Sequence, residues 1–389
     1  MLTALLADRL FAGDGDAVRP GCVVVENGVI RSVGDAAPPA GSRVIALKDA
    51  TLLPGLIDAH THVSIMPSLG NQIEQFKLPA DVQLASARSN VLADLLSGVT
   101  TLRIMGQEFD VDFRLRDEIE QGRTIGPRLL CAGVQLAKPD SHGHAITSVE
   151  TLDDIEALAE RNIARGAALL KIFVTGGVAS AGTWLTQSPF SHEEVARAAA
   201  VAHRHGVKLA AHAHGGAGAR VAVEAGLDTL EHGSLLDDEL IELVARRGVA
   251  IVGTFSVLFH PSGIMAGDAA VPAVIEKARQ VGELVERTWR KILQTDIPIA
   301  VGSDSMHGCL AFDVMQLVRF GATPARALRA ATAGGAEVCG IGGSTGALRP
   351  GLRADILAVR GNPLEDIRAI ASPLLVMKAG RVVHAVERI

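Results

Sequence analysis

Short apolar runs alternate with longer helical patterns along the middle of the chain, between about residues 52 and 340. Strands that are buried on both faces are nearly continuous in apolar residues, and helices between such runs are typical of repeated βα units around a parallel sheet. Eight runs fit this description: 52–60, 99–105, 128–133, 168–174, 207–213, 227–233, 249–255 and 297–304. We therefore predict an α/β fold, a (β/α)8 TIM-like barrel over residues 52–344.

Both ends of the chain have a different pattern. Residues 1–51 and 345–389 contain short alternating runs with Asn-Gly and Ala-Gly turn signals, which are typical of β-hairpins. The simplest assembly is one small β-sandwich domain built from both ends and lying beside the barrel. We expect two domains, because a chain of 389 residues exceeds the roughly 250 residues of a barrel.

Composition and charge point to small-molecule partners. A net charge of −6 with interspersed signs provides no basic stripe for nucleic acid. The four cysteines are scattered without CxxC spacing, which argues against a disulfide framework or a thiolate zinc site. Acidic and basic residues interrupt the apolar N-terminus, so we expect no signal peptide, and no long uncharged apolar run suggests a membrane span. We expect a cytoplasmic protein.

Polar residues stand where several of the apolar runs end. Catalytic groups of (β/α)8 barrels project from the carboxyl ends of the strands. The residues that this position selects are His60, His62, Lys171, His212, His214, Glu231, His232 and Asp304. Each alone has an ordinary explanation, such as a buried histidine bonded to a carbonyl or an aspartate that caps a helix. Together they indicate a metal site, because imidazole and carboxylate ligands without cysteine suit zinc, manganese or cobalt.

Lys171 lies inside the apolar run 168–174. A buried ammonium without a partner is strongly disfavoured, so Lys171 needs either a nearby carboxylate or a chemical change. Burial that lowers its pKa would leave a neutral amine able to react with carbon dioxide. The resulting carbamate is an anionic ligand with two oxygens, and it could bridge two divalent metal ions.

Other residues are candidates for contacts with a substrate. Arg103 could bind a substrate carboxylate or form a structural salt bridge. The glycines of segment 175–177 let backbone amides approach a ligand, or simply form a tight turn. Trp184 is a possible lid contact, and segment 255–274, which includes His260, is an apolar candidate for a pocket wall or for packing.

Several segments in combination resemble the amidohydrolase superfamily. They are LLPGLIDAHTHV (52–63), KIFVTGGVAS (171–180), AAHAHGG (210–216), TLEHGS (229–234), VGSDS (301–305) and GALRPGLRADILAV (346–359). The resemblance covers nearly the whole chain and is strongest to imidazolonepropionase-like proteins, to metal-dependent Xaa-Pro and Xaa-Arg dipeptidases, and to ochratoxin-hydrolysing amidases.

The resemblance implies a ligand set for two divalent metal ions, with zinc as the first choice. It makes His60, His62 and Asp304 ligands of the more buried ion, and His212 and His232 ligands of the second. Lys171 is implied to be the carboxylated bridge between the ions. His214 lies on the same strand face as His212, and we assign it to substrate contact.

A further catalytic histidine is implied in the segment KPDSHGHA (138–145). The segment resembles a TGGHG loop whose histidine polarises the substrate carbonyl, and the matching residue is His142. Here Pro139, Asp140 and Ser141 replace the Thr-Gly-Gly, which leaves the shape of the loop open. His144 is the alternative.

The function implied is a binuclear amidohydrolase that cleaves an amide bond of a dipeptide or N-acyl amino acid by metal-activated hydroxide. Asp304 would transfer the proton and His142 would stabilise the oxyanion. The alternative is hydrolysis of a cyclic amide, an imidazolone-type ring or a lactone. A mononuclear deaminase is disfavoured by the buried lysine, and a barrel that has lost its metals is disfavoured by the intact ligand set. A homo-oligomer remains open.

Overall fold

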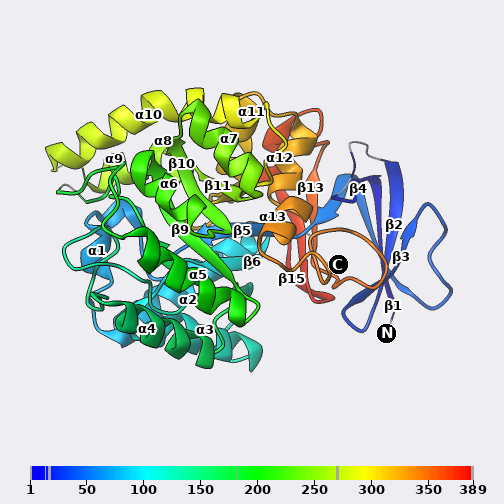
Figure 1. Ribbon diagram of the computed structural model, residues 1–389. Helices are drawn as coiled ribbons and strands as arrows, with labels where there is room; N and C mark the ends of the chain where they lie inside the picture. The colour runs from blue at the N-terminus through cyan, green and yellow to red at the C-terminus, as the bar shows by residue number, and fades with distance from the viewer. Residues whose placement is uncertain (1, 14, 16–18, 181, 269–270, 387–389) are drawn as a thin grey trace.

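The computed structural model describes residues 2–13, 15, 19–180, 182–268 and 271–386. Residues 269 and 270 of the expected apolar wall, and the ends of the two terminal segments, lie outside the described residues. Figure 1 shows a large part in which helices surround central strands, and a smaller part in which strands from both chain ends lie together.

Two parallel sheets make up the core of the large part. One contains β5 (Leu56–Thr61), β6 (Val99–Ile104) and β7 (Arg128–Leu130). The other has the order β12-β11-β10-β9-β8, with bounds Ile299–Gly302, Ala250–Thr254, Thr229–Leu235, Lys208–Gly215 and Leu169–Phe173. All eight predicted runs thus contain a strand of the parallel sheets.

The two parallel sheets are connected at both edges. Leu136, just after β7, forms a parallel bridge with Ile172 of β8. At the other edge, the N–H of Asp304 donates to the carbonyl of His60 over 2.8 Å. A β-carbon on Gly302 would lie 2.4 Å from that of His60, so only glycine permits this close approach of β12 to β5.

The helices that cover these strands begin and end where the sequence supplies caps. Thr151 and Ser191 each form a capping box with an acidic residue three positions on, at the starts of α4 (Leu152–Ala164) and α5 (His192–Arg204). Asp237 caps α7 (Asp238–Arg247), which ends at Gly248 in the left-handed conformation.

The remaining helices have the following bounds: α1 Gln72–Gln75, α2 Ala80–Leu96, α3 Val111–Glu120, α6 Gly216–Glu224, α8 Ser256–Phe259, α9 Ile264–Gly267, α10 Pro272–Ile292, α11 Leu310–Arg319, α12 Pro324–Ala330 and α13 Ala333–Val338. Short 3-10 helices are η1 (Pro67–Leu69), η2 (Glu108–Asp110) and η3 (Ile367–Ala371). Within the described part of the chain, none of the helices has the length and apolarity needed to cross a bilayer.

Strands from the two chain ends form one seven-stranded sheet. Its order is β15-β14-β13-β4-β1-β2-β3. The bounds, in the same order, are Arg381–Ala385, Pro373–Lys378, Ile356–Arg360, Arg43–Pro54, Leu2–Leu10, Arg19–Glu26 and Val29–Gly34. The pairing of β13 with β4 joins the two ends, and apolar side chains from both ends share one buried cluster.

The first predicted run, 52–60, was wrong as a single strand. Residues 52–54 end β4 in the seven-stranded sheet, whereas β5 begins at Leu56 in a parallel sheet. The break falls at Pro54-Gly55, where proline lacks the N–H that a continued ladder would use. An unbroken apolar run could not reveal it, because both halves are buried.

Candidate metal centre

Most of the residues predicted at the strand ends meet in one pocket, although Lys171 and Glu231 are not among its described lining residues. His60, His62, His142, His212, His214, His232 and Asp304 all line it, together with the polar residues Gln72, Ser234 and Thr254. The pocket encloses about 670 Å³ of empty space, counting its mouth.

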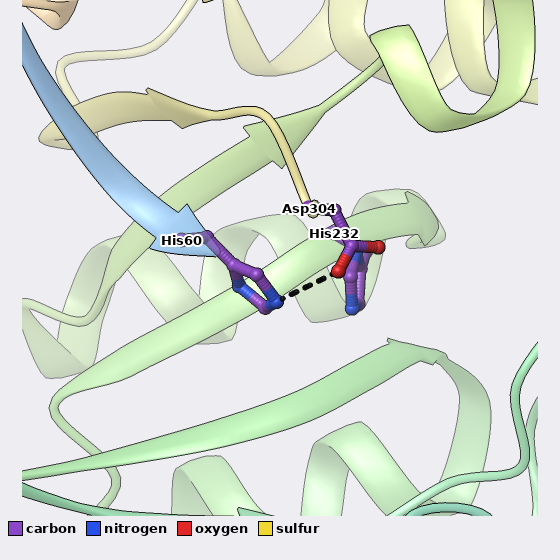
Figure 2. Close-up of side chains that lie close together, drawn as sticks. All are labelled: His60, His232 and Asp304. Carbon is purple, nitrogen blue, oxygen red and sulfur yellow. Dashed lines mark ion pairs between the residues drawn. The ribbon is translucent and has the colours of Figure 1, made fainter. Parts of the chain in front are cut away.

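Three of these side chains come close enough to hold one ion. Ligand atoms of His60, His232 and Asp304 all lie within 4.8 Å of one another. Figure 2 shows these three side chains converging, with the ion pair between His60 and Asp304 drawn. The Oδ1 atom of Asp304 lies 3.5 Å from Nε2 of His60 and 3.8 Å from Nε2 of His62.

Fixed partners on β6 and β10 and in the loop after β6 decide which nitrogen of His60 and His62 faces Asp304. Nδ1 of His60 lies 2.7 Å from the Glu231 carboxylate, and Nδ1 of His62 lies 3.1 Å from the Gly106 carbonyl. Both oxygens can only accept, so both Nδ1 atoms donate, and the Nε2 atoms are the nitrogens that face Asp304. The carboxylate of Glu231 forms a salt bridge with Arg103, with 2.8 Å between Oε1 and Nη2. Arg103 therefore has a structural role.

His212 and His232 form the second pair of ligands in the predicted set. Nε2 of His212 donates to the Gly176 carbonyl over 3.1 Å, and Nδ1 of His232 lies 2.7 Å from the Thr254 hydroxyl. The remaining nitrogens, Nδ1 of His212 and Nε2 of His232, are 2.8 Å apart. Because Nε2 of His212 carries the proton of that neutral ring, Nε2 of His232 donates to Nδ1 of His212. Each ring therefore has one nitrogen fixed by the protein and the other turned toward its partner.

Burial lowers the pKa values of four of these histidines and keeps their imidazoles neutral, which is the form that binds metal; they are His62, His212, His214 and His232. Desolvation lowers the pKa of His62 to about 3 and that of His214 to about 4. It also lowers the pKa values of His212 and His232 well below their ordinary range. Burial opposes ionisation of Asp304, but the hydrogen bond with His60 and the neighbouring imidazoles outweigh burial, so the pKa of this carboxyl is lowered.

Lys171 lies deeply buried beside this cluster, with 1% of its surface exposed. Its Nζ has no hydrogen-bond partner among the described residues and lies 4.8 Å from the centroid of the Phe173 ring. Burial lowers the pKa of Lys171 to about 8, although the charges of Glu231 and Asp304 raise it. The carboxylate pairing that could have explained a buried lysine is thus absent from the described contacts.

The backbone is strained where the cluster forms. His232, Asp304 and Ser305 have φ angles of 75°, 48° and 74°, a region that side-chain-bearing residues rarely adopt. Such strain costs on the order of 1–3 kcal/mol per residue and is concentrated at functional sites. It supports a functional role for the ends of β10 and β12.

His142 reaches the pocket from the loop after β7. Its ring lies against Gly177, where a β-carbon would come within 2.1 Å of Nε2, and its Nδ1 lies 2.7 Å from the Ser180 hydroxyl. Burial lowers its pKa to about 3. His144 lines a different hollow instead, and its Nδ1 accepts from the N–H of Asp140 over 3.2 Å.

The other candidate substrate contacts divide between the pocket and the surface. Val257, Leu258 and Ile264 of segment 255–274 line the pocket, as expected for a wall. His260 is not among its described lining residues, and Trp184 is 71% exposed. Sequence reasoning missed Gln72, Ser234 and Thr254, although Ser234 ends the segment TLEHGS and Thr254 lies near the end of the run 249–255.

The sequence profile of the amidohydrolase family matches residues 51–383. The chain belongs to the amidohydrolase family. It is therefore a hydrolase that acts on carbon–nitrogen bonds of small molecules, in a family that depends on metal ions. The residues of the cluster fit such an ion, because imidazoles and an ionised carboxylate converge near an amine that has no hydrogen-bond partner in the described part of the chain.

Individual relatives are similar to this amidohydrolase over nearly its full length. Ochratoxinase from Aspergillus niger is 28% identical, with 96% of this chain and 84% of the relative covered. Imidazolonepropionase from Nocardia farcinica is 26% identical, with 88% and 85% covered. The crystal structure of a Xaa-Pro dipeptidase with bound methionine in the active site is 29% identical, covers 99% of this chain and 100% of its own, and has a TM-score of 0.91.

Proposed function

We propose that this amidohydrolase is a binuclear enzyme that cleaves the amide bond of a dipeptide or an N-acyl amino acid. The observation that carries the proposal is the buried amine of Lys171, which has no hydrogen-bond partner among the described residues and lies near a cluster of imidazoles and one carboxylate. A buried lysine with a structural role would form an ion pair with a carboxylate. A lysine that becomes a carbamate and bridges two ions needs an amine that is free of such a pair and can lose its proton.

The ligand set of the proposal divides between two ions, with zinc as the first choice. His60, His62 and Asp304 would hold one, and His212 and His232 the other. Lys171 would bridge them as a carbamate, formed when its neutral amine adds to carbon dioxide and loses one proton. When bound, the ions supply Lewis acidity and a hydroxide at neutral pH.

Asp304 has the position and the ionisation state of a proton shuttle. Its carboxylate is ionised and lies within 4 Å of both His60 and His62. It would accept the proton of the attacking water and deliver it to the leaving nitrogen. Partial exposure of its side chain leaves it accessible to a substrate in the pocket.

His142 and His214 are the proposed substrate contacts. His142 is neutral and bonded through Nδ1 to Ser180, so its Nε2 can donate to the oxygen of the scissile carbonyl. An aligned donor of this kind contributes on the order of 3 kcal/mol to transition-state binding. The Nε2 of His214 is buried in the pocket wall and has no partner among the described residues.

The strand connections support a closed barrel. We propose that the two parallel sheets together form a (β/α)8 barrel over residues 52–344, because contacts connect both of their edges. Residues 1–51 and 345–389 would form the second domain, a β-sandwich whose seven-stranded sheet already combines both ends.

The substrate class of the proposal rests on relatives and on the pocket. Relatives named Xaa-Pro dipeptidase and ochratoxinase match nearly the whole chain, and the former holds methionine in its active site. Hydrolysis of an imidazolone-type ring remains the alternative, supported by the similarity to imidazolonepropionase at 26% identity.

Metal analysis combined with a Lys171→Ala variant tests the proposal. We expect about two divalent ions per wild-type chain, fewer in the variant, and activity lost in the variant but partly restored by short carboxylic acids, which replace the carbamate. A folded wild-type chain that takes up no ions would overturn the binuclear centre. Amine release from dipeptides and N-acyl amino acids, compared with ring-opening of cyclic amides, separates the two substrate classes.

A further inference from the structure

The wall of the pocket that faces the metal cluster is apolar. It is formed by the segment around η1 and α1, by the loop after β8, and by α8 and α9. The side chains that make it up are Ile65, Ile73, Phe76, Val178, Val257 and Ile264. These segments lie far apart in the sequence, yet all six side chains face one space.

Charge is confined to the cluster side of the pocket. Among the described residues that line it, Asp304 is the one carboxylate, and neither a lysine nor an arginine contributes. The nearby cation Lys277 is occupied, since its Nζ donates to the carbonyls of Ser180 and Thr183 over 2.6 Å each. A charged substrate side chain placed against the apolar wall would therefore lose its hydration without gaining a counter-charge.

One hydrogen-bond donor interrupts the apolar wall. Gln72 begins α1, lines the pocket and is 8% exposed, and its Nε2 is buried with no partner in the described part of the chain. The neighbouring glutamines differ: Gln75 donates to the carbonyls of Met66 and Gly70, and Gln83 to those of Phe76 and Leu78. A buried donor without an acceptor is costly, so a ligand that brings an acceptor oxygen would relieve it.

We propose that the wall selects substrates with an uncharged apolar side chain beside the scissile amide, such as that of leucine, methionine or phenylalanine. Gln72 is then a specificity-determining residue whose Nε2 donates to an oxygen next to that side chain. The inference rests on the proposed amide-cleaving function and narrows its substrate class.

Two matched dipeptide series, Gly-X and X-Gly, test the selectivity on both sides of the scissile bond. With X as leucine, methionine or phenylalanine, we expect kcat/KM in one of the series to exceed that for lysine, arginine, aspartate or glutamate by about 100-fold or more, because the charged groups would be buried unpaired. Charged and apolar X cleaved within tenfold of each other in both series would overturn the inference.

Binding to the metal-free protein separates this inference from the proposed function. Isothermal titration calorimetry with Nα-acetyl-leucine and Nα-acetyl-lysine is expected to detect binding of the leucine derivative only. If the metal-loaded enzyme cleaves no amide while the apolar ligand still binds selectively, the proposed function fails, but the selectivity of the wall for apolar ligands stands. Equal binding of both ligands would overturn the inference.

Substitutions at Gln72 test the donor itself. Gln72→Leu keeps the volume but removes the donor, and we expect KM for the apolar substrate to rise about fivefold with kcat nearly unchanged, as for one lost neutral hydrogen bond. Gln72→Glu places a carboxylate in the wall and is expected to raise kcat/KM for X = lysine at least tenfold relative to leucine.

Gln75→Leu is the matched control on the same helix. It removes hydrogen bonds that hold α1 but changes no residue lining the pocket, so its leucine-to-lysine preference should equal that of the wild type. A preference that shifts as much in Gln75→Leu as in Gln72→Glu would assign the effect to the order of α1 and overturn the role of Gln72.

Discussion

Two buried polar regions of this amidohydrolase differ in how their groups are paired. At the junction of the seven-stranded sheet with β7, the buried carboxylate of Asp355 accepts from Arg128, Thr345 and the N–H of Ala379 over 2.8–3.0 Å. At the pocket end of the parallel strands, the described contacts give no hydrogen-bond partner to Lys171 Nζ, Gln72 Nε2 or His214 Nε2.

This difference in hydrogen bonding distinguishes buried groups that stabilise the fold from buried groups that await a ligand. A saturated buried carboxylate stabilises one arrangement of the chain, because losing any partner leaves an unsatisfied group. Buried groups without partners destabilise the chain alone and gain their partners only from a ligand. The cost of these buried groups without hydrogen-bond partners is typical of a binding site, whatever the catalytic role of the pocket.

The largest expected effect is at Asp304. Asp304→Asn keeps the shape of the side chain but removes its charge and its ability to accept a proton, so kcat should fall about 1,000-fold, within the range for a lost general acid–base group. The measurement is steady-state kinetics on a metal-quantified sample. Loss of less than tenfold, with metal content unchanged, would remove Asp304 from proton transfer.

The saturated region is tested by Asp355→Ala. The substitution leaves the Arg128 guanidinium and the buried Thr345 hydroxyl without their acceptor, so the free energy of unfolding should fall by about 3 kcal/mol. Denaturant titration measures it. The exposed pair Arg246–Glu242 on α7 provides the control, since Glu242→Ala should change stability by about 0.5 kcal/mol or less.

Asp313, another buried carboxyl group, is expected to make the free energy of unfolding depend on pH. Its Oδ1 accepts from the N–H groups of Phe255 and Ser256, its Oδ2 is unpartnered within the described residues, and burial raises its pKa from 3.8 to about 8. Between these values the unfolded chain has lost the proton and the folded chain keeps it. Stability therefore falls as pH rises through this window.

The test of this dependence compares wild type with Asp313→Asn between pH 5 and pH 7. The wild type should lose about 1.4 kcal/mol of unfolding free energy per pH unit relative to the variant. Other titrating groups cancel in the difference. Parallel stability curves for the two proteins would show that Asp313 is ionised in the folded state.

The smallest expected effect is at Lys277, a cation near the pocket that is well partnered. From α10 its Nζ donates to Ser180 and Thr183, and the Ser180 hydroxyl bonds His142. Lys277→Met should free this loop and lower kcat/KM about fivefold, roughly 1 kcal/mol, through misplacement of His142. In a protein that already carries His142→Ala, Lys277→Met should lower kcat/KM no further. If the losses of the two single variants add in the double variant, Lys277 does not act through His142.

The positions of the strand ends could be predicted from the sequence because their physical cause is local. A strand buried on both faces excludes polar residues, so His60, Lys171, His212 and Asp304 stand out where the apolar runs continue or stop. Family resemblance then supplied roles for these residues. The Pro54-Gly55 crossing escaped prediction, since both of its flanking strands are apolar.

Contacts between distant segments could not be predicted. Whether Arg103 binds a substrate or a protein carboxylate depends on its distance from Glu231, 128 residues away in the sequence. The choice between His142 and His144 depends on which one reaches Gly177. Gln72 has no sequence signal at all, because a glutamine becomes notable only when its surroundings leave it unpaired.

The sequence by itself determined the order of buried strands, the strand-end histidines and the family of the chain. These properties follow from hydrophobic periodicity and from side-chain chemistry, which each short segment carries alone. Only the tertiary structure decided which ring nitrogens face Asp304, which buried groups lack partners and which side chains form the apolar wall. Those properties depend on distances of a few ångströms between segments that folding brings together.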